Sequence, residues 1–193
     1  MSLSRRTQRM LKLSGSHGIV RRYLIVNGFD GALTMLGLIV GFVVSEPAEL
    51  QLVINACLAA AIALGMSGIS SAYVSEVAER KRALDELEGA MISDLGDSAH
   101  GRAARWVPVL VALVNGGAPL VISLVIIAPL WLAQAGFSLP LAPLWFAVVI
   151  AGLSIFVLGV LLGRIADVSW VRSGVRTLMI AIATVSLIFL LTS

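Results

Sequence analysis

The sequence predicts an all-α integral membrane protein with five transmembrane helices, its N-terminus in the cytoplasm and its C-terminus outside. Three observations lead to this fold class. The 193 residues are 59% hydrophobic and only 13% charged, whereas soluble domains are about 25% charged. The apolar residues gather into five runs that are long enough to cross a bilayer. The basic residues are confined to alternate connections between those runs, as expected when positive loops stay in the cytoplasm.

The apolar runs define the expected elements in order. They cover residues 23–44, 50–72, 106–133, 141–163 and 174–191. Each run is near the roughly 20 residues that a helix needs to span the hydrocarbon core. We expect residues 1–22 to form a basic cytoplasmic tail and residues 23–193 to form one membrane domain, because a chain of this size leaves no room for a second folded domain.

Lysine and arginine give an independent test of the topology. All 14 of them lie in the N-terminal tail, the second connection or the fourth connection, with Arg176 at the start of the fifth run counted with the fourth connection. The first connection, the third connection and the C-terminus carry none. This distribution predicts an odd number of spans that starts from the cytoplasm. The basic residues are Arg5, Arg6, Arg9, Lys12, Arg21 and Arg22 in the tail, Arg80, Lys81, Arg82, Arg102 and Arg105 in the second connection, and Arg164, Arg172 and Arg176 in the fourth.

Three connections are expected to be short turns, an acidic one with Glu46 and Glu49 and two others around residues 136–140 and 167–173. The connection over residues 73–105 is longer. Its apolar residues recur at spacings of three, four and seven, which is typical of an amphipathic helix. The second transmembrane helix is therefore expected to extend into the cytoplasm. The apolar positions are Val74, Val77, Leu84, Leu87, Met91 and Leu95.

The third run contains Pro119 and Pro129. Each proline removes one hydrogen bond from a helix, and so we expect a bend or a break near residues 115–119. A break at the Gly-Gly-Ala-Pro sequence can bind an ion, but prolines are also tolerated in membrane helices that only bend. Both interpretations fit the sequence.

Asp30 is the charged residue that lies deep inside a predicted span, about seven residues from its cytoplasmic end. Placing a carboxylate in the membrane costs about 2.5 kcal/mol or more, so such residues normally face a bundle interior or an aqueous path. A protonated aspartic acid that only fixes helix packing is the alternative. Asn27, Thr34, Gly37 and Gly41 recur at three and four residues from one another and share a face with Asp30. Gly37 and Gly41 also form a small-xxx-small pair, which permits close helix packing.

The second span carries a similar stripe, formed by Asn55, Ala59, Met66, Ser70 and Tyr73. Carboxylate, amide, hydroxyl and thioether groups together suit a divalent transition metal. The predicted metal- and proton-binding set is Asp30, Asn27, Thr34, Met66, Ser70 and Asn55. Met66 can equally be a packing residue.

The cytoplasmic connection is rich in carboxylates. Glu76, Glu79, Asp85, Glu86 and Glu88 are candidates for collecting cations near the mouth of a path, or they form a solvated helix face. No catalytic or nucleotide-binding motif is present, and we expect neither enzymatic activity nor a resident cofactor. The basic residues flank apolar runs without base-stacking aromatics among them, so nucleic acid is not an expected partner.

Three segments resemble the vacuolar iron transporter family, which consists of divalent-metal transporters with five transmembrane helices. Asn-Gly-Phe-Asp-Gly-Ala-Leu-Thr at 27–34 is similar to the Asp-Gly motif of the family's first helix. Ala-Tyr-Val-Ser-Glu at 72–76 resembles the end of its second helix, and Arg-Ser-Gly-Val-Arg-Thr-Leu at 172–178 the start of its fifth. The connection at 73–105 is shorter than the family's metal-binding domain, so the chain resembles a short-loop prokaryotic type.

The resemblance implies a homodimer that exports Fe(II) or Mn(II) from the cytosol in exchange for protons, along a path between the first two helices of both protomers. Asp30 matches the family's membrane aspartate, and Met66 is the nearest candidate for its methionine. A gapless alignment places Gly68 at the methionine position and Ala72 where relatives often carry glutamate. A prokaryotic plasma membrane is the expected location. The alternatives are a transporter or channel for another cation or small solute, and a dimeric membrane anchor or sensor without transport.

Overall fold

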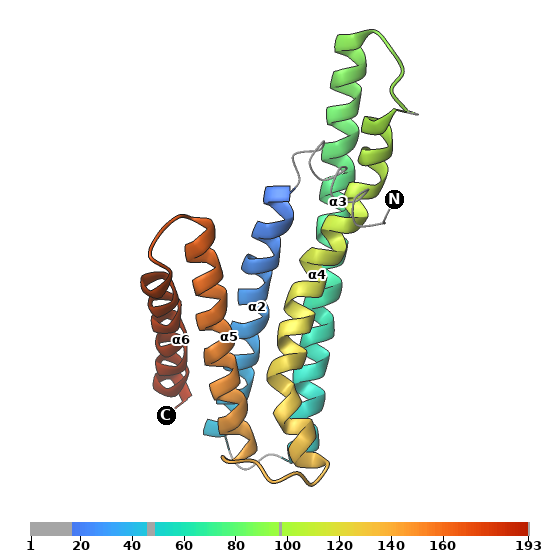
Figure 1. The fold of residues 1–193 in the computed structure, drawn as a ribbon. Coiled ribbons are helices and arrows are strands. Elements are labelled where there is room, and N and C mark those ends of the chain that lie inside the picture. The colour runs from blue at the N-terminus through green and yellow to red at the C-terminus, as the bar shows by residue number, and fades with distance from the viewer. Residues whose placement is uncertain (1–16, 46–48, 97, 193) are drawn as a thin grey trace. The chain divides into compact units, whose positions relative to one another are not determined.

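The computed structural model describes residues 17–45, 49–96 and 98–192, and the regular structure in these segments is entirely helical. Five helices follow one another in this part of the chain, namely α2 (His17–Val44), α3 (Leu50–Met91), α4 (Ala99–Gln134), α5 (Pro143–Ile165) and α6 (Trp170–Thr192) (Figure 1). Each of them is long and apolar enough to cross a membrane. The prediction of an all-helical fold with five spanning helices is confirmed. Arg5, Arg6, Arg9, Lys12, Glu46 and Pro47 lie outside the described residues.

The helices extend beyond the apolar runs that predicted them. α3 continues without interruption to Met91, as expected for a helix that extends past the second span. α6 begins at Trp170, so the predicted polar turn at 167–173 is wrong in its second half, where Arg172 and Ser173 are helical. The reason is that apolar composition marks contact with lipid, whereas polar residues next to the membrane can remain helical.

The beginning of α5 is set by a proline. Pro143 occupies the first turn, where its missing N–H costs nothing. Ala142 before it has φ −53° and ψ 139°, an extended conformation that a following proline favours. The helix therefore begins at Pro143 rather than at Leu141, where the apolar run starts.

α4 is helical through Pro108, Pro119 and Pro129. The alternative of a break near residues 115–119 is therefore excluded, which leaves the interpretation of a helix that only bends. A proline in a membrane helix leaves one carbonyl oxygen without its usual donor, and neighbouring groups can compensate for that loss.

Three helices end with a residue in the left-handed conformation. Gly136 has φ +87° after α4, Ile92 has φ 51° after α3, and Asp167 has φ 52° after α5. In each case an N–H beyond the helix donates to a carbonyl oxygen five residues earlier, at 3.0, 3.3 and 3.1 Å respectively. This is the Schellman arrangement, for which glycine is the preferred residue.

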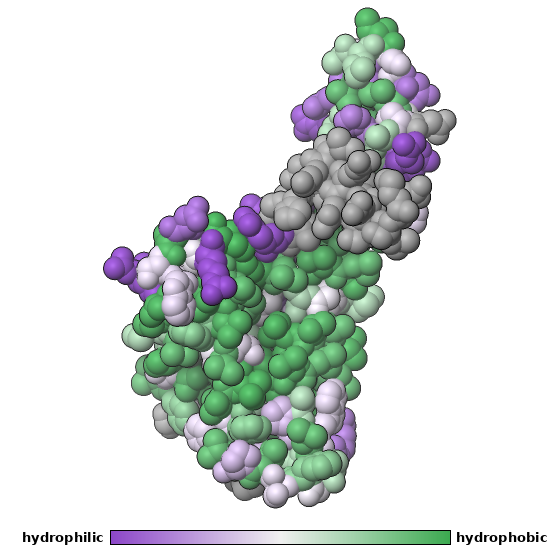
Figure 2. All heavy atoms as spheres, in the orientation of Figure 1, coloured by the Kyte–Doolittle hydropathy of each residue, from purple (hydrophilic) through white to green (hydrophobic). Residues whose placement is uncertain are grey.

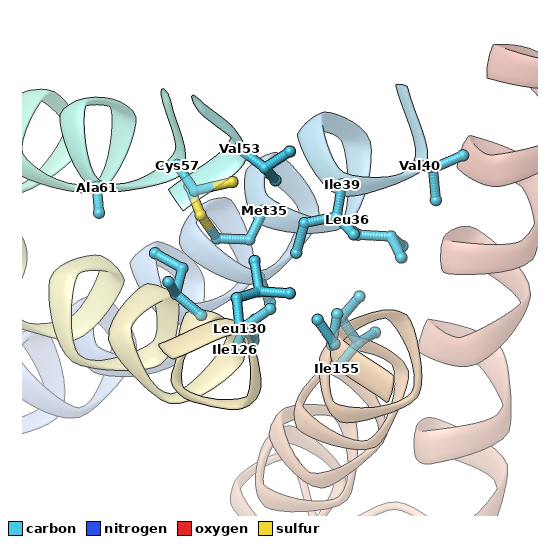
Figure 3. Packing of buried hydrophobic residues seen from close by; sticks show 14 of the residues in the cluster. Met35, Leu36, Ile39, Val40, Val53, Cys57, Ala61, Ile126, Leu130 and Ile155 are labelled. Carbon is cyan, nitrogen blue, oxygen red and sulfur yellow. The ribbon is translucent and has the colours of Figure 1, made fainter. Parts of the chain in front are cut away.

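The chain divides into two compact units, and the first comprises Ile25–Gly65 with Ala118–Ser193. Its core contains Met35, Ile39, Cys57, Leu130 and Ile155, all of which are fully buried. Figure 3 shows these side chains, contributed by α2, α3, α4 and α5, pointing into one cluster.

Within this unit α5 packs closely on α6. A Cβ added at Gly159 would overlap Thr177 Oγ1, and one added at Gly163 would lie 2.7 Å from the Ser173 Cβ. Thr177 Oγ1 also lies 3.2 Å from the Ile155 carbonyl oxygen, which it can donate to across the helix pair. Small residues at the contact therefore let the two backbones approach.

The second unit comprises residues 66–117 and the beginning of α2. Its smaller core is formed by Ala72 of α3 and by Ala103, Val107 and Val111 of α4. In the space-filling view, hydrophobic residues cover the sides of the helices and hydrophilic residues gather near helix ends (Figure 2). This pattern is the one expected of helices surrounded by lipid.

Candidate functional site

Asp30 lies inside the membrane-spanning part of α2 and is exposed on the surface of the protomer. Asn27 and Thr34, one turn to either side of Asp30 on the helix, are half-buried. The opposite face of α2 carries Ala32, Met35 and Ile39, which are fully buried in the core cluster. The helix is therefore oriented by its apolar face, and its polar face points away from the core.

The Asp30 carboxylate has no hydrogen-bond or ion-pair partner within the described part of the chain. An unpaired carboxylate that faces hydrocarbon is costly, so its surroundings in the membrane must supply water, a cation or a second protein surface. The packing alternative raised by the sequence requires a partner for Asp30, and the protomer provides none among its described residues.

The polar stripe on α3 also faces outward. Asn55, Ala59, Met66, Ser70 and Tyr73 are all exposed in the protomer, and Met66 is 57% exposed. Gln51 donates to Asn55 Oδ1 at 2.9 Å, and the Ser70 hydroxyl donates to the Met66 carbonyl oxygen at 2.8 Å. Asn55 Oδ1 and the Ser70 hydroxyl oxygen each keep a lone pair that can accept a further bond.

The predicted ligands are divided between the two compact units. Asp30, Asn27, Thr34 and Asn55 belong to one unit, whereas Met66 and Ser70 belong to the other. The structure therefore assigns no contact between Asp30 and Met66. What the two stripes share is that no member of either is buried.

Gly37 and Gly41 make no close helix contact with the described residues of the protomer. A Cβ at Gly37 would meet only Ile188 Cδ1 at 3.9 Å, and no atom of the described residues lies within 4 Å of a Cβ at Gly41. The close contact of α2 is made instead at Gly31, where a Cβ would lie 2.6 Å from the Pro119 carbonyl oxygen. The sequence showed Gly31 only as part of the Asp-Gly motif and gave no sign of its neighbour.

The cytoplasmic carboxylates are partly engaged with their own helix. Glu76 is only 3% exposed, and Arg80 Nε lies 3.1 Å from its Oε2. Glu86 forms an exposed pair with Arg82 at 2.9 Å, and Glu88 Oε1 accepts the Leu95 N–H at 2.8 Å. Glu79 and Asp85 are exposed. No group of three His, Cys, Asp or Glu side chains among the described residues could hold a metal ion.

Asn115 is a polar residue whose structural partner the sequence did not indicate. It is 7% exposed, and its Nδ2 donates to the Gly68 carbonyl oxygen at 2.7 Å. With Tyr23, Ser71 and Ser75 it lines a shallow cavity of about 250 Å³. Because Pro119 has no N–H, the Asn115 carbonyl oxygen also lacks its usual intrahelical donor. Hydroxyl and amide groups therefore meet at this point inside the unit.

An uncharacterized protein of the archaeon Methanocaldococcus jannaschii is similar to this chain. The two are 28% identical over 173 residues, which cover 88% of this chain and 87% of the archaeal protein. The similarity therefore extends over nearly the whole length of both. No family model matches the chain, and no solved structure matches it.

Proposed function

We propose that the protein is a proton-coupled transporter that exports a divalent transition metal, Fe²⁺ or Mn²⁺, from the cytosol. The observation that carries the proposal is the position of Asp30, an exposed carboxylate without a partner in the described part of the chain, within a membrane-spanning helix. Intramembrane carboxylates of this kind are typical of ion and proton pathways.

The proposed active form is a homodimer with the metal path between α2 and α3 of the two protomers. Two polar stripes, one on each helix, are exposed or half-buried in the protomer. A second copy that covers them would remove Asp30 from lipid and would surround it with further oxygen ligands. Gly41, which has open space beside it, would then permit close contact between protomers rather than within one.

The proposed orientation places the N-terminus and every basic residue in the cytoplasm and the C-terminus outside. The distribution of all 14 lysines and arginines supports it. The part of α3 between residue 73 and Met91 then projects into the cytoplasm as an amphipathic helix. Its carboxylates lie on the side from which metal would enter.

Coupling to protons follows from competition for one group. A metal ion binds the ionised carboxylate of Asp30, so the affinity for metal falls as protons bind. An acidic compartment on the far side would therefore promote release, and deprotonation on the cytoplasmic side would prepare the next cycle. Asn27 and Thr34, which share a face of α2 with Asp30, supply neutral oxygen ligands of the kind that Mn²⁺ and Fe²⁺ accept.

The resemblance of residues 27–34, 72–76 and 172–178 to vacuolar iron transporters supports the same function. It comes from motifs that include Asp30 itself. The proposal does not depend on the cytoplasmic carboxylates, because a cluster of three is missing from the described residues.

Metal flux in proteoliposomes tests the proposal. With the cytoplasmic face outward and an acidic interior, we expect uptake of Fe²⁺ or Mn²⁺ that stops when the pH gradient is removed. Asp30→Asn should abolish uptake. Asp167→Asn is the matched control, since Asp167 lies in the exposed turn after α5 with φ 52°, a conformation that asparagine adopts readily.

Three results would contradict the proposal. Unchanged metal flux in Asp30→Asn would remove Asp30 from the path. Flux of a monovalent cation or another solute without divalent metal would favour a different transporter or channel. The third result compares two variants in the cell. If deletion of the cytoplasmic part of α3 abolishes the function of the protein while Asp30→Asn retains it, an anchor or sensor is favoured.

A further inference from the structure

A groove runs between the cytoplasmic extension of α3 and the beginning of α4, within one compact unit. Its volume is about 530 Å³, and it is lined by Tyr73, Val77 and Lys81 of α3 and by Ala104 and Arg105 of α4. The end of the groove at Tyr73 and Val77 is apolar and aromatic. Lys81 and Arg105 make the next part basic, and Leu84 lies beyond Lys81 on α3. No carboxylate is among the residues that line it in the described part of the chain.

The position of the groove along the membrane normal follows from which residues of α3 and α4 lie at the same height. A Cβ at Gly68 would lie 2.9 Å from the Gly116 Cα, so these residues lie at the same level. α3 and α4 are antiparallel, and each residue further along α3 is matched by one residue back along α4. Val77 is thus level with Val107, and Lys81 with Ala103.

The amino-acid composition of α3 and α4 indicates where the bilayer surface lies along these helices. The apolar run of α4 begins at Trp106, which is 59% exposed, and Tyr73 of α3 is 47% exposed. Exposed tryptophan and tyrosine favour the headgroup region of a membrane. Val77 therefore lies at the edge of the hydrocarbon, and Lys81, one turn further out by roughly 6 Å, lies at the depth of the lipid phosphates.

The two basic groups are arranged differently. Arg105 is held at the wall of the groove, because its Nη2 donates to the Gly96 carbonyl oxygen and its Nε donates to that of Gly101 at 3.4 Å. The Lys81 ammonium has no hydrogen-bond or ion-pair partner among the described residues. By contrast, Arg82, the next residue along, is paired with Glu86 on the exposed face of the helix.

We infer that this groove binds the headgroup of an anionic phospholipid from the cytoplasmic leaflet, with the phosphate at Lys81 and Arg105 and the upper acyl chain along Val77 and Tyr73. The position at the membrane surface, the charge of Lys81, which has no ion-pair partner among the described residues, and the apolar inner end all match such a lipid. An acidic peptide would match the charge but would leave the apolar end uncovered. The assignment uses the proposed orientation and is independent of metal transport.

The binding of phosphatidylglycerol to the purified full-length protein, measured by native mass spectrometry, tests the inference. We expect Lys81→Gln to weaken binding about fivefold, as estimated for one lysine at an anionic surface. Arg82→Gln removes the same charge from the adjacent position and should leave binding unchanged. Ala104→Phe, which fills the groove without changing charge, should also weaken binding. Asp30→Asn should bind the lipid normally, which separates this site from the proposed metal path.

The control variants and control lipids define the results that would overturn the inference of a lipid site. Equal losses in Lys81→Gln and Arg82→Gln would show general attraction to charge and would overturn the inference. Equal binding of phosphatidylcholine would do the same. Displacement of the lipid by millimolar glycerol phosphate would assign the groove to a soluble phosphate instead. Melting temperatures of the lipid-free variants should equal that of the wild type, and unchanged lipid binding in a correctly folded Ala104→Phe would exclude the groove.

Discussion

Asn115 of α4 donates its side-chain amide to the Gly68 carbonyl oxygen of α3 at 2.7 Å, at a point where the two backbones lie close together. The contact needs a residue without a side chain on α3, because a Cβ at Gly68 would lie 2.9 Å from the Gly116 Cα and 3.0 Å from the Asn115 carbonyl oxygen. A hydrogen bond and a close backbone contact thus occur together near Pro119.

Gly68→Ala is expected to destabilise the protein by about 1–3 kcal/mol, because the added methyl group meets backbone atoms that cannot rotate away. Gly89 lies on the same helix with no atom within 4 Å of a Cβ, among the described residues. Gly89→Ala should therefore be neutral or should stabilise by about 0.5–1 kcal/mol. Unfolding in detergent micelles compares the two variants, and equal stabilities would show that the helices do not touch at Gly68.

Two glycines of α2 should affect different properties. Gly31→Ala is expected to lower the stability of the protomer, since its Cβ would lie 2.6 Å from the Pro119 carbonyl oxygen. Gly41→Leu should leave that stability nearly unchanged but should weaken self-association, because Gly41 is proposed to face the second copy. Light scattering coupled to size-exclusion chromatography measures the association. A Gly41→Leu protein that remains fully dimeric would place the dimer contact elsewhere.

The two ion pairs of α3 should differ in strength. Glu76→Gln is expected to cost about 1–3 kcal/mol, because Glu76 is buried and its charge-assisted bond to Arg80 is lost. Glu86→Gln should cost less than about 1 kcal/mol, since its pair with Arg82 is exposed. Chemical denaturation in detergent gives both values. The reverse order would mean that Glu76 is in contact with water in the assembled protein.

The sequence was sufficient to predict the helices because lipid imposes a simple requirement of length and composition. It predicted their ends less well. The polar residues Arg172 and Ser173 predict a turn, although residues 170–173 form the first turn of α6. Pro119 left open a bend or a break in α4. The helix continues through Pro119, which excludes the break, and a single sequence does not contain the surrounding contacts that decide between the two.

The candidate site could be predicted only in part, again because lipid favours apolar composition. A carboxylate in an apolar run is conspicuous, so Asp30 could be selected, and its exposure agrees with a role outside the protomer core. The partners of a residue are not visible in helical periodicity. Gly31 and Asn115 therefore appeared only as parts of motifs, although each makes a close contact with another segment. The glycine pair at Gly37 and Gly41 has no such neighbour among the described residues.

The most direct test of the central claim is the anomalous scattering of crystals of the purified protein soaked in Mn²⁺ or Fe²⁺. The account predicts a peak within bonding distance of the Asp30 carboxylate, at a junction between two copies of the chain, and loss of this peak in Asp30→Asn. A carboxylate that faces acyl chains, with metal bound elsewhere or not at all, would contradict the proposed transport function.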